Sequence, residues 1–406
     1  MPSSVDLLCA VLGALRTGVI PVVLNPALVA EERAALLADA EPVLVVDDGG
    51  ELAQLTDGAP TDLAPVPLGR PMHYTSGTSG RPKGVWSGVL SEDDARALFE
   101  DERSVWGFAP GDVHLVCSPL FHSAAIRFSA GTLLSGGDVV LLPRFDASAA
   151  ADAIAVERPT TAFMAPAHLQ RLFASGSVPD LSSFRLLAHA GAPCPEPLKL
   201  AAMDAFPSGS VWEFYGSTEG QFTVCPPDLW LERPGTVGRA RPGRTLSVDP
   251  DGTIWCAVPP HARFEYWRDA DKTAAAWRGD AFTVGDLGRL DDDGCLFLDG
   301  RRDDLIISGG VNVYPAEVER VLAGAAGVGE VAVFGAPDER WGQRVCAAVV
   351  ADGAVDPAVV LAEARRHLAP YKCPKDVYLV DTLPRTATGK VRRSAIAGRL
   401  GLDGEG

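Results

Sequence analysis

The chain has 406 residues, of which 47% are hydrophobic and 22% charged, as is typical of a soluble globular protein with two or three domains. Its net charge of −17, from 36 basic against 53 acidic residues, excludes a nucleic-acid-binding protein that relies on broad basic patches. No apolar stretch reaches the roughly 18 residues of a membrane span, and no basic residue precedes the apolar run at 7–15 as in a signal peptide. We therefore expect a cytoplasmic protein that binds neither nucleic acid nor membranes.

From Val19 to about Tyr215, short apolar runs alternate with amphipathic stretches. This alternation predicts parallel sheets covered by helices, which bind ligands at the carboxyl ends of their strands. The expected strands are 19–24, 42–46, 113–117, 139–142, 160–164 and 184–187, and the expected helices are 30–38, 123–134, 147–157 and 195–205.

After Pro226 the pattern changes to short strands separated by Gly, Asp and Pro turns, with a hairpin turn expected at 291–294. A compact unit of about a hundred residues is expected from Asp303 onward. The sequence thus predicts two domains, 1–302 and 303–406. The second is expected to have helices at 315–322 and up to His367, and strands at 328–334, 344–350 and 376–380.

The cysteines are scattered, with no CxxC pair and no Cys/His cluster at zinc-site spacing. This pattern predicts reduced thiols in a cytoplasmic protein. The eight positions are Cys9, Cys117, Cys194, Cys225, Cys256, Cys295, Cys346 and Cys373.

The first motif with chemical meaning is YTSGTSGRPKG, at 74–84. Small hydroxyl residues and glycines let backbone N–H groups converge on phosphate oxygens, and Lys83 adds a positive charge. It is not a Walker A loop, because Pro82 stands where that loop has glycine. The composition alone fits a phosphate-binding loop and a flexible surface loop about equally well.

The second motif is EFYGSTEG, at 213–220, after an expected strand. Tyr215 could stack on a base, Thr218 could contact a phosphate, and Glu219 could hold Mg²⁺ through its carboxylate oxygens. The motif is weak by itself, because turns that end strands often contain Gly, Ser and Glu.

Two further motifs lie closer to the C-terminus. In the long run from Gly285 to Glu319, Asp286 sits in a tight Gly-x-x-Gly turn where a carboxylate can accept both hydroxyls of a ribose, and Arg301 could serve the same sugar. The motif PRTATGK, at 384–390, ends in Lys390. Hairpin turns with solvated charges and an ordinary basic tail are the alternatives to a function for these two motifs.

The four motifs, in this order and at these separations, resemble those of acyl-CoA synthetases, luciferases and nonribosomal peptide synthetase adenylation domains, and most closely acyl- or aryl-CoA ligases. The resemblance runs from about Leu8 to Ile396. It implies a large N-terminal α/β domain of mostly parallel sheets flanked by helices, with a small distorted β-barrel region. A smaller, mobile α+β domain would follow, with a hinge at Asp303.

The resemblance also implies roles for individual residues in binding ATP, Mg²⁺ and CoA. Tyr215 would pack on adenine, Thr218 would contact the α-phosphate, Glu219 would hold the magnesium, and Lys390 would stabilise charge at the α-phosphorus. The β- and γ-phosphates would lie on Thr75, Ser76, Gly77, Thr78, Ser79, Gly80 and Lys83, the other adenine wall would be Gly191, Ala192 and Pro193, the ribose would bind Asp286 and Arg301, and the thiol would approach Gly309 and Gly310.

Three residues are expected near the acid substrate. His122 matches a position between the nucleotide and acyl pockets, His189 precedes the Gly191 turn, and Phe214 is a candidate for the pocket wall. Each also has an ordinary structural explanation, since a lone His beside an apolar run is usually a core or capping residue, and Phe214 fits a core equally well.

The sequence departs from the family pattern in two places. The chain starts where family members have already formed one or two strand–helix units, so an edge of the sheet would be uncovered, which favours a homodimer or another partner. The segment 257–266 also lacks the glycines usual there.

The resemblance implies ATP-dependent activation of a carboxylic acid to acyl-AMP with release of pyrophosphate, followed by transfer to CoA. Two alternatives remain open. One is an adenylating enzyme with another acceptor, a carrier-protein thiol or an amine, or with an unusual acid such as nitrite. The other is a non-catalytic nucleotide-binding partner protein, which would have no use for a lysine like Lys390.

Overall fold

The structure is a computed structural model of the 406-residue chain that describes residues 1–54, 61–75, 83–176, 178–192, 194, 196–301, 306–313, 315–384, 391 and 393–402. Its contacts divide the chain into two compact units. The first comprises Met1–Leu24, Pro42–His73 and Gly84–Gly300, and the second comprises Asn25–Glu41, Tyr74–Lys83 and Arg301–Gly406. Asp303, the predicted hinge, lies outside the described residues, so the boundary at that residue stays a prediction.

A parallel sheet forms the centre of the first unit. Its short apolar strands are mostly buried, as the central strands of a sheet covered on both faces must be. Neighbouring strands pair in parallel in the order β4-β3-β5-β6-β7. The strands are β3 (Val113–Val116), β4 (Asp138–Leu141), β5 (Thr161–Met164), β6 (Leu186–His189) and β7 (Val211–Glu213).

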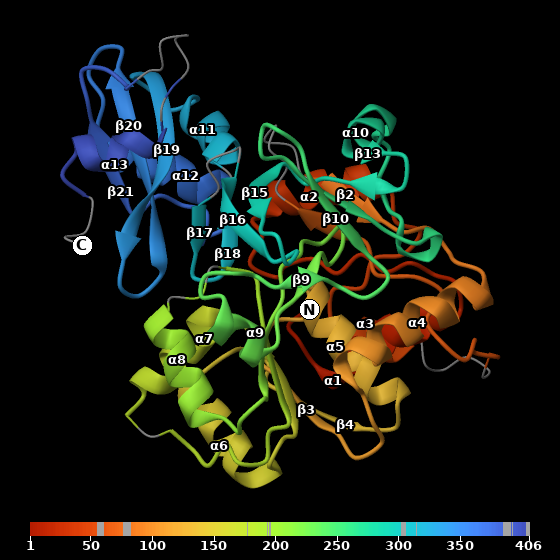
Figure 1. The fold of residues 1–406 in the computed structure, drawn as a ribbon. Coiled ribbons are helices and arrows are strands. Elements are labelled where there is room, and N and C mark those ends of the chain that lie inside the picture. The colour runs from red at the N-terminus through yellow and green to blue at the C-terminus, as the bar shows by residue number, and fades with distance from the viewer. Residues whose placement is uncertain are drawn as a thin grey trace. The chain divides into compact units, whose positions relative to one another are not determined.

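Helices cover both faces of this sheet (Figure 1). One face packs on α6 (Ala147–Glu157), α7 (Pro166–Ala174) and α8 (Glu196–Ala205) through a cluster that includes the fully buried Ile154 and Leu169. The other face packs on α1 (Val5–Arg16), α4 (Glu92–Trp106) and α5 (Ser123–Leu134). Side chains at the first turns fix where these helices begin, as when Asp146 accepts a 3.0 Å hydrogen bond from the N–H of Ala149.

The remainder of the first unit is a set of short antiparallel strands around an aromatic core that includes Phe222, Phe264 and Phe282. A four-stranded sheet has the order β10-β11-β14-β13. The elements here and in the connecting segments are α3 (Gly49–Gln54), β1 (His73–Thr75), β2 (Lys83–Trp86), β8 (Thr223–Val224), α9 (Pro227–Glu232), β9 (Arg239–Ala240), β10 (Thr245–Val248), β11 (Ile254–Ala257), η1 (Pro260–Ala262), β12 (Glu265–Tyr266), α10 (Ala270–Ala276), β13 (Trp277–Arg278), β14 (Ala281–Phe282), β15 (Asp286–Leu290) and β16 (Leu296–Arg301).

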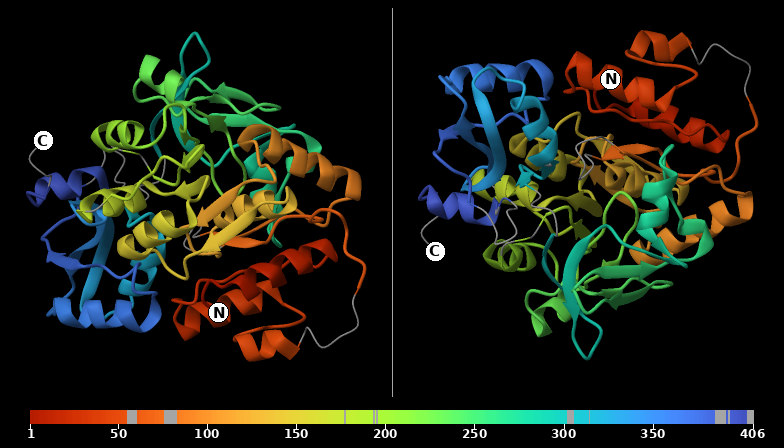
Figure 2. Two further views of the ribbon diagram at one scale, coloured as in Figure 1. Left: turned by 90° about the horizontal axis from the view of Figure 1, so that it is seen from below. Right: turned by 90° about the horizontal axis from the view of Figure 1, so that it is seen from above.

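The second unit is built on the long hairpin of β19 (Val328–Asp338) and β20 (Gly342–Ala351), seen as blue strands flanked by helices in Figure 2. Lys372 of this unit is buried between Glu32 and Glu317, with Nζ–Oε1 distances of 3.0 and 2.6 Å. The other elements are α2 (Ala30–Ala40), β17 (Ile306–Ser308), β18 (Val311–Val313), α11 (Pro315–Leu322), α12 (Pro357–His367), β21 (Asp376–Leu379), η2 (Arg393–Ala395) and α13 (Ile396–Arg399).

The fold class expected from the sequence is confirmed, and so are most of the expected elements. Two expected strands are wrong. Residues 19–24 form only an isolated bridge between Val22 and Met72, and residues 42–46 form no strand. Val43 and Leu44 are 101% and 57% exposed, and no described strand pairs with this segment. An apolar run becomes a strand only where a neighbour takes its backbone hydrogen bonds. The expected strand at 184–187 forms two residues later, as β6, because Phe184 donates its N–H to Leu181 in a turn.

Candidate active site

The carboxyl edge of the parallel sheet gathers the predicted site residues of the first unit. The chain leaves β3 and reaches His122, the residue before α5, and it leaves β6 at His189 and turns at Gly191. It leaves β7 at Glu213 and continues into Phe214 and Tyr215. Neighbouring parallel strands end at the same edge, so segments far apart in sequence lie together there.

A tight turn after Tyr215 presents the second motif. Gly216 pairs with Gln221, and the N–H of Ser217 donates to the carbonyl of Gly220 at 2.9 Å. A Cβ on Gly216 would lie 2.9 Å from the Gln221 Cα, and a Cβ on Gly220 would lie 2.8 Å from the Phe282 ring. Only glycine fits at either position, so the turn holds residues 217–219 at its tip. The Ser217 hydroxyl is buried there with no hydrogen-bond partner among the described residues.

The two residues expected to hold adenine and ribose contact each other. The Tyr215 hydroxyl donates to Asp286 Oδ2 at 2.5 Å, and the two residues are 8% and 4% exposed. The sequence separates them by 71 residues, and β15 brings Asp286 to the turn. An aromatic ring beside a buried carboxylate fits an adenosine, whose base can stack on the ring and whose ribose hydroxyls can donate to the carboxylate.

Glu219 is oriented by a residue that no sequence motif singled out. The Tyr266 hydroxyl donates to Glu219 Oε1 at 2.9 Å, and Glu219 is 4% exposed. The groups that could bind a metal ion here are all oxygens: the hydroxyls of Ser217 and Thr218 and the carboxylate of Glu219. Hard cations such as Mg²⁺ take oxygen ligands, and Mg²⁺ usually binds to one or two carboxylates together with substrate phosphates. The residues present therefore fit a magnesium ion.

Three histidines near this edge are held neutral. Burial lowers the pKa of His122 to about 4, and burial together with the nearby His122 lowers the pKa of His73 to about 4. His189 is 1% exposed, and burial followed by the charge of Lys199 lowers its pKa well below the ordinary value. At pH 7 these imidazoles are therefore uncharged, which suits them to fill and shape the site rather than to bind phosphate.

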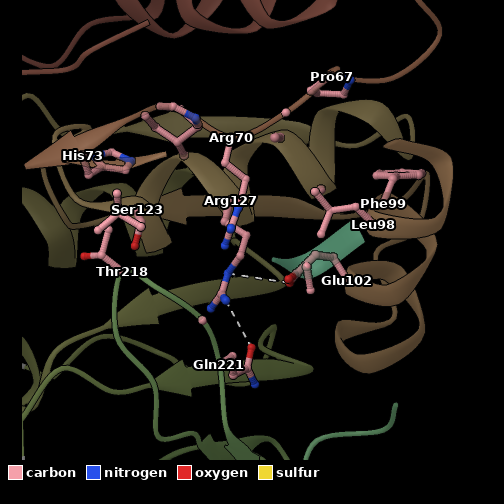
Figure 3. A pocket seen from close by; sticks show the side chains of 18 of the residues that line it. Pro67, Arg70, His73, Leu98, Phe99, Glu102, Ser123, Arg127, Thr218 and Gln221 are labelled. Carbon is pink, nitrogen blue, oxygen red and sulfur yellow. Dashed lines mark hydrogen bonds and ion pairs between the residues drawn. The ribbon is translucent and has the colours of Figure 1, made fainter. Parts of the chain in front are cut away.

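A cavity of about 140 Å³ lies within the first unit beside this turn. Figure 3 shows Thr218 and Ser123 on one side of Arg127, and Leu98 and Phe99 on the other. The lining includes Thr218 but not His122, His189 or Phe214. Further lining residues that matter here are Arg70, His73, Glu102, Gln221, Arg241 and Arg244.

Phe214 is a core residue in the structure. Its ring packs with those of Trp106 and Phe163, with centroids 5.3 and 5.8 Å apart, and it is 7% exposed. The guanidinium of Arg127 lies 5.0 Å from the Phe214 centroid, so Phe214 supports a cavity residue. The sequence analysis missed Arg127, Arg70 and Gln221. For Arg127 a signal was available, because it is the only charged residue in the otherwise apolar and small-residue helix α5.

The remaining predicted residues lie elsewhere. Thr75, Lys83, Gly309 and Gly310 belong to the second unit. Gly309 has φ of +60°, and a Cβ there would lie 2.6 Å from the Trp341 ring, so only glycine fits. Gly191 and Ala192 follow β6, with Gly191 at φ of +90°. Ser76, Gly77, Thr78, Ser79, Gly80, Pro193, Asp303, Lys390 and the side chain of Arg301 are outside the described residues.

A parallel sheet with ligand-binding loops at the carboxyl ends of its strands is the arrangement of many nucleotide-binding α/β enzymes. The profile of the AMP-binding enzyme matches residues 71–259, and that of the AMP-binding enzyme C-terminal domain matches residues 317–390. The chain belongs to the AMP-binding enzyme family.

Similar proteins include CoA ligases and an amide bond synthetase. The chain is 37% identical to indoleacetate–CoA ligase of Aromatoleum aromaticum over 80% of its own length and 66% of the ligase. It resembles the solved o-succinylbenzoate CoA synthetase of Bacillus subtilis, with a TM-score of 0.84 and 28% identity over 97% of this chain and 86% of that one. It also resembles the amide bond synthetase of Marinactinospora thermotolerans, with a TM-score of 0.82 and 29% identity over 95% and 86%.

These findings confirm the family, the enzyme class of AMP-forming acid–thiol ligases, and its cofactors ATP, Mg²⁺ and CoA. They favour an enzyme over a non-catalytic nucleotide-binding protein. The eight cysteines are free thiols. Among the described residues, no helix has both the length and the hydrophobicity needed to cross a membrane.

The turn gives a first test. We expect Gly220→Ala to weaken ATP binding by about tenfold or more, equal to about 1.4 kcal/mol, because the new methyl group must displace the Phe282 ring or open the turn. Titration calorimetry with ATP and Mg²⁺ measures this. Gly111→Ala is the matched control, since its Cβ would meet no atom within 4 Å. Equal ATP affinity in both variants would show that the turn does not organise the nucleotide site.

The buried His73 predicts a pH dependence of stability. The unfolded state binds a proton below about pH 6.5 and the folded state only below about pH 4. Neutral His73 therefore makes its full contribution to stability above about pH 6.5. This contribution is lost as the pH falls toward 4, and the loss reaches about 2 kcal/mol near pH 5. Denaturant unfolding at neutral and mildly acidic pH should show a smaller acid destabilisation for His73→Gln. If the unfolding free energy of His73→Gln fell with pH as steeply as that of the wild type, buried His73 would not be held neutral.

Proposed function

We propose that this chain uses ATP to activate a carboxylic acid as its acyl-AMP and then transfers the acyl group to the thiol of CoA. The observation that carries the proposal is the Gly216–Gln221 turn. It directly follows Tyr215, which contacts Asp286, and it places Thr218 on the wall of the cavity. A nucleotide contact and an acid-sized pocket thus share one turn.

In the first half-reaction, a carboxylate oxygen of the acid attacks the α-phosphorus of ATP, the bond to pyrophosphate breaks, and acyl-AMP forms. The Thr218 hydroxyl would donate to an α-phosphate oxygen, and Tyr215 and Asp286 would fix the adenosine. Glu219, oriented by Tyr266, would hold Mg²⁺, which supplies charge neutralisation to the phosphates. No general base is required, because a carboxylic acid is already ionised near pH 7, so the work is positioning and electrostatics.

In the second half-reaction, the CoA sulfur attacks the acyl carbonyl carbon and AMP leaves with the bonding electrons. We propose that the second unit rotates about a hinge at Asp303. This rotation would withdraw Lys390 and bring Gly309 and Gly310 to the thiol. The absence of a side chain at Gly309 and Gly310 allows a pantetheine arm to approach closely. The remaining assignments follow the same logic: Thr75, Ser76, Gly77, Thr78, Ser79, Gly80 and Lys83 to the β- and γ-phosphates, Gly191, Ala192 and Pro193 to adenine, Arg301 to ribose, and His122 and His189 to the walls beside the acid.

The similar amide bond synthetase supports a second candidate, in which an amine rather than CoA accepts the acyl group. A carrier-protein thiol is a further acceptor of the same kind. The acyl-AMP step is common to all of these, so they differ only in what enters after pyrophosphate leaves.

A homodimer and a cytoplasmic location are part of the proposal. The exposed Val43 and Leu44 offer an apolar edge segment to which a second copy could add. The free cysteines suit a reducing compartment. Light scattering of the protein and of a Val43→Lys, Leu44→Lys double variant tests the dimer.

The function is tested by pyrophosphate release with ATP and Mg²⁺ against a panel of carboxylic acids, each with and without CoA. Acids like those in the relatives' names, indoleacetate and o-succinylbenzoate, are natural starting members. We expect acid-dependent release, with a thioester only when CoA is present. If pyrophosphate release rises with an amine but no thioester forms with CoA, the second candidate would be supported. If the protein binds ATP but releases no pyrophosphate with any acid of the panel, the proposal would be contradicted.

Lys390 separates the half-reactions. We expect Lys390→Ala to lower the adenylation rate by about a hundredfold or more, because one donor to developing charge is removed, and to spare thioester formation from supplied acyl-AMP. Single-turnover assays of each half-reaction measure this. Lys375→Ala is a control on a different lysine of the same unit. Equal loss in both half-reactions would refute the assignment.

A further inference from the structure

We propose that the acid this site activates carries a second carboxylate, and that Arg127 and Arg70 bind that carboxylate inside the cavity. The inference rests on the proposed function and narrows its substrate class to dicarboxylic acids. It is carried by the charges and contacts around one cavity of the first unit.

The cavity is lined by more cations than anions. Four arginines line it, Arg70, Arg127, Arg241 and Arg244, whereas Glu102 is its one lining carboxylate. Asp101 stands behind the wall and pairs with Arg244 at 2.6 Å. Glu219, whose backbone carbonyl accepts from Arg70, adds a third negative charge nearby. Four positive charges against these three negative ones leave an excess of one, which would favour a bound anion.

Arg241 and Arg244 are committed to the wall. Arg241 donates from Nη1 to Glu102 Oε1 at 2.9 Å and to Gln221 Oε1 at 3.0 Å, and its side chain is 2% exposed. The Arg244 side chain is 5% exposed and is held by Asp101. These two arginines make the closest contacts to the two carboxylates, so Arg127 and Arg70 are the arginines left for a ligand.

Arg127 has only weak anionic compensation. Its Nη1 donates to the neutral Gln221 Oε1 at 3.1 Å, and its Nε lies 3.6 Å from Glu102 Oε2, an oxygen that already accepts from Trp106 at 3.2 Å. The Arg127 side chain is 24% exposed and rests on Phe214. The guanidinium is thus positioned by packing and keeps donor capacity for a ligand.

Arg70 forms no ion pair with any described carboxylate. Its Nη1 and Nη2 donate to the backbone carbonyls of Glu219 and Arg263, at 3.3 Å each. Burial lowers the pKa of Arg70 to about 10; among the nearby charges Glu102 raises this pKa most and Glu219 raises it as well, whereas Arg127 and Arg244 lower it. A carboxylate between Arg70 and Arg127 would offset their positive charge.

The two ends of the substrate can then be placed. The reacting carboxylate belongs at Thr218, the wall residue of the nucleotide turn, and Figure 3 shows Arg70 and Arg127 farther along the same cavity. Ile126 and Ala130 contribute apolar lining on α5. A diacid could place its reacting carboxylate at Thr218 and its second carboxylate at the two arginines. A monocarboxylic acid would leave the second cationic position without a counter-charge.

The test compares dicarboxylic acids with monocarboxylic acids of equal chain length, from malonate and propionate to suberate and octanoate, by kcat/KM for pyrophosphate release. We expect the wild type to prefer the diacid at the fitting length. Arg127→Met should lower kcat/KM for that diacid about ten- to hundredfold, the effect of losing a hydrogen bond to a charged group, and lower it much less for the monoacid. Arg127→Lys should retain part of the preference, because it keeps the charge.

Arg278→Met is the matched control, since Arg278 is an exposed arginine paired with Asp249 on the surface. Thermal stabilisation by the diacid alone is a second readout, which Arg127→Met should abolish. Release from monoacids at least as fast as from diacids, or an equal fall for both in Arg127→Met, would overturn the inference and leave the proposed function standing. Diacid stabilisation that depends on Arg127, without pyrophosphate release from any acid, would support the anion site and contradict the proposed function.

Discussion

The site of this enzyme depends on a six-residue turn that two glycines make possible. Gly216 and Gly220 are packed so closely against Gln221 and Phe282 that a methyl group fits at neither position. The turn is anchored to the aromatic core through Phe282, so its tip is held by the rigid part of the fold. Because Ser217, Thr218 and Glu219 sit at that tip, the hydroxyls and the carboxylate keep their spacing without a ligand. Preorganisation of this kind lowers the entropy cost of ordering the site when a nucleotide binds.

The molecule is acidic overall but carries a local cluster of arginines at the cavity. A net charge of −17 disfavours anions at long range, so ATP and an acid must be bound by groups placed close to them. The structure places arginines along the cavity and keeps the neighbouring histidines neutral by burial. Arginine holds its charge when buried, whereas histidine loses it, and the cavity uses each accordingly.

The parallel sheet and its helices could be predicted from the sequence because apolar runs and helical periods are local signals. The helices 123–134 and 147–157 and the strand at 113–117 formed where expected. The segment 42–46 has the same local signal and failed, because a strand also needs a neighbour. The motif residues Tyr215 and Asp286 were identified through the family resemblance, and their mutual contact required the fold. Tyr266, Arg70 and Gln221 belong to no motif, and only three-dimensional packing brings them to the site.

The central claim is that a carboxylate attacks the α-phosphorus at the carboxyl edge of the sheet. It is tested most directly with an acid whose carboxylate oxygens are ¹⁸O, by mass spectrometry of the AMP released. The account predicts that AMP gains one ¹⁸O atom, since the attacking oxygen remains on phosphorus when the acyl group departs. AMP without ¹⁸O, formed while the acid is still consumed, would contradict it, because the acyl-AMP would then not lie on the path.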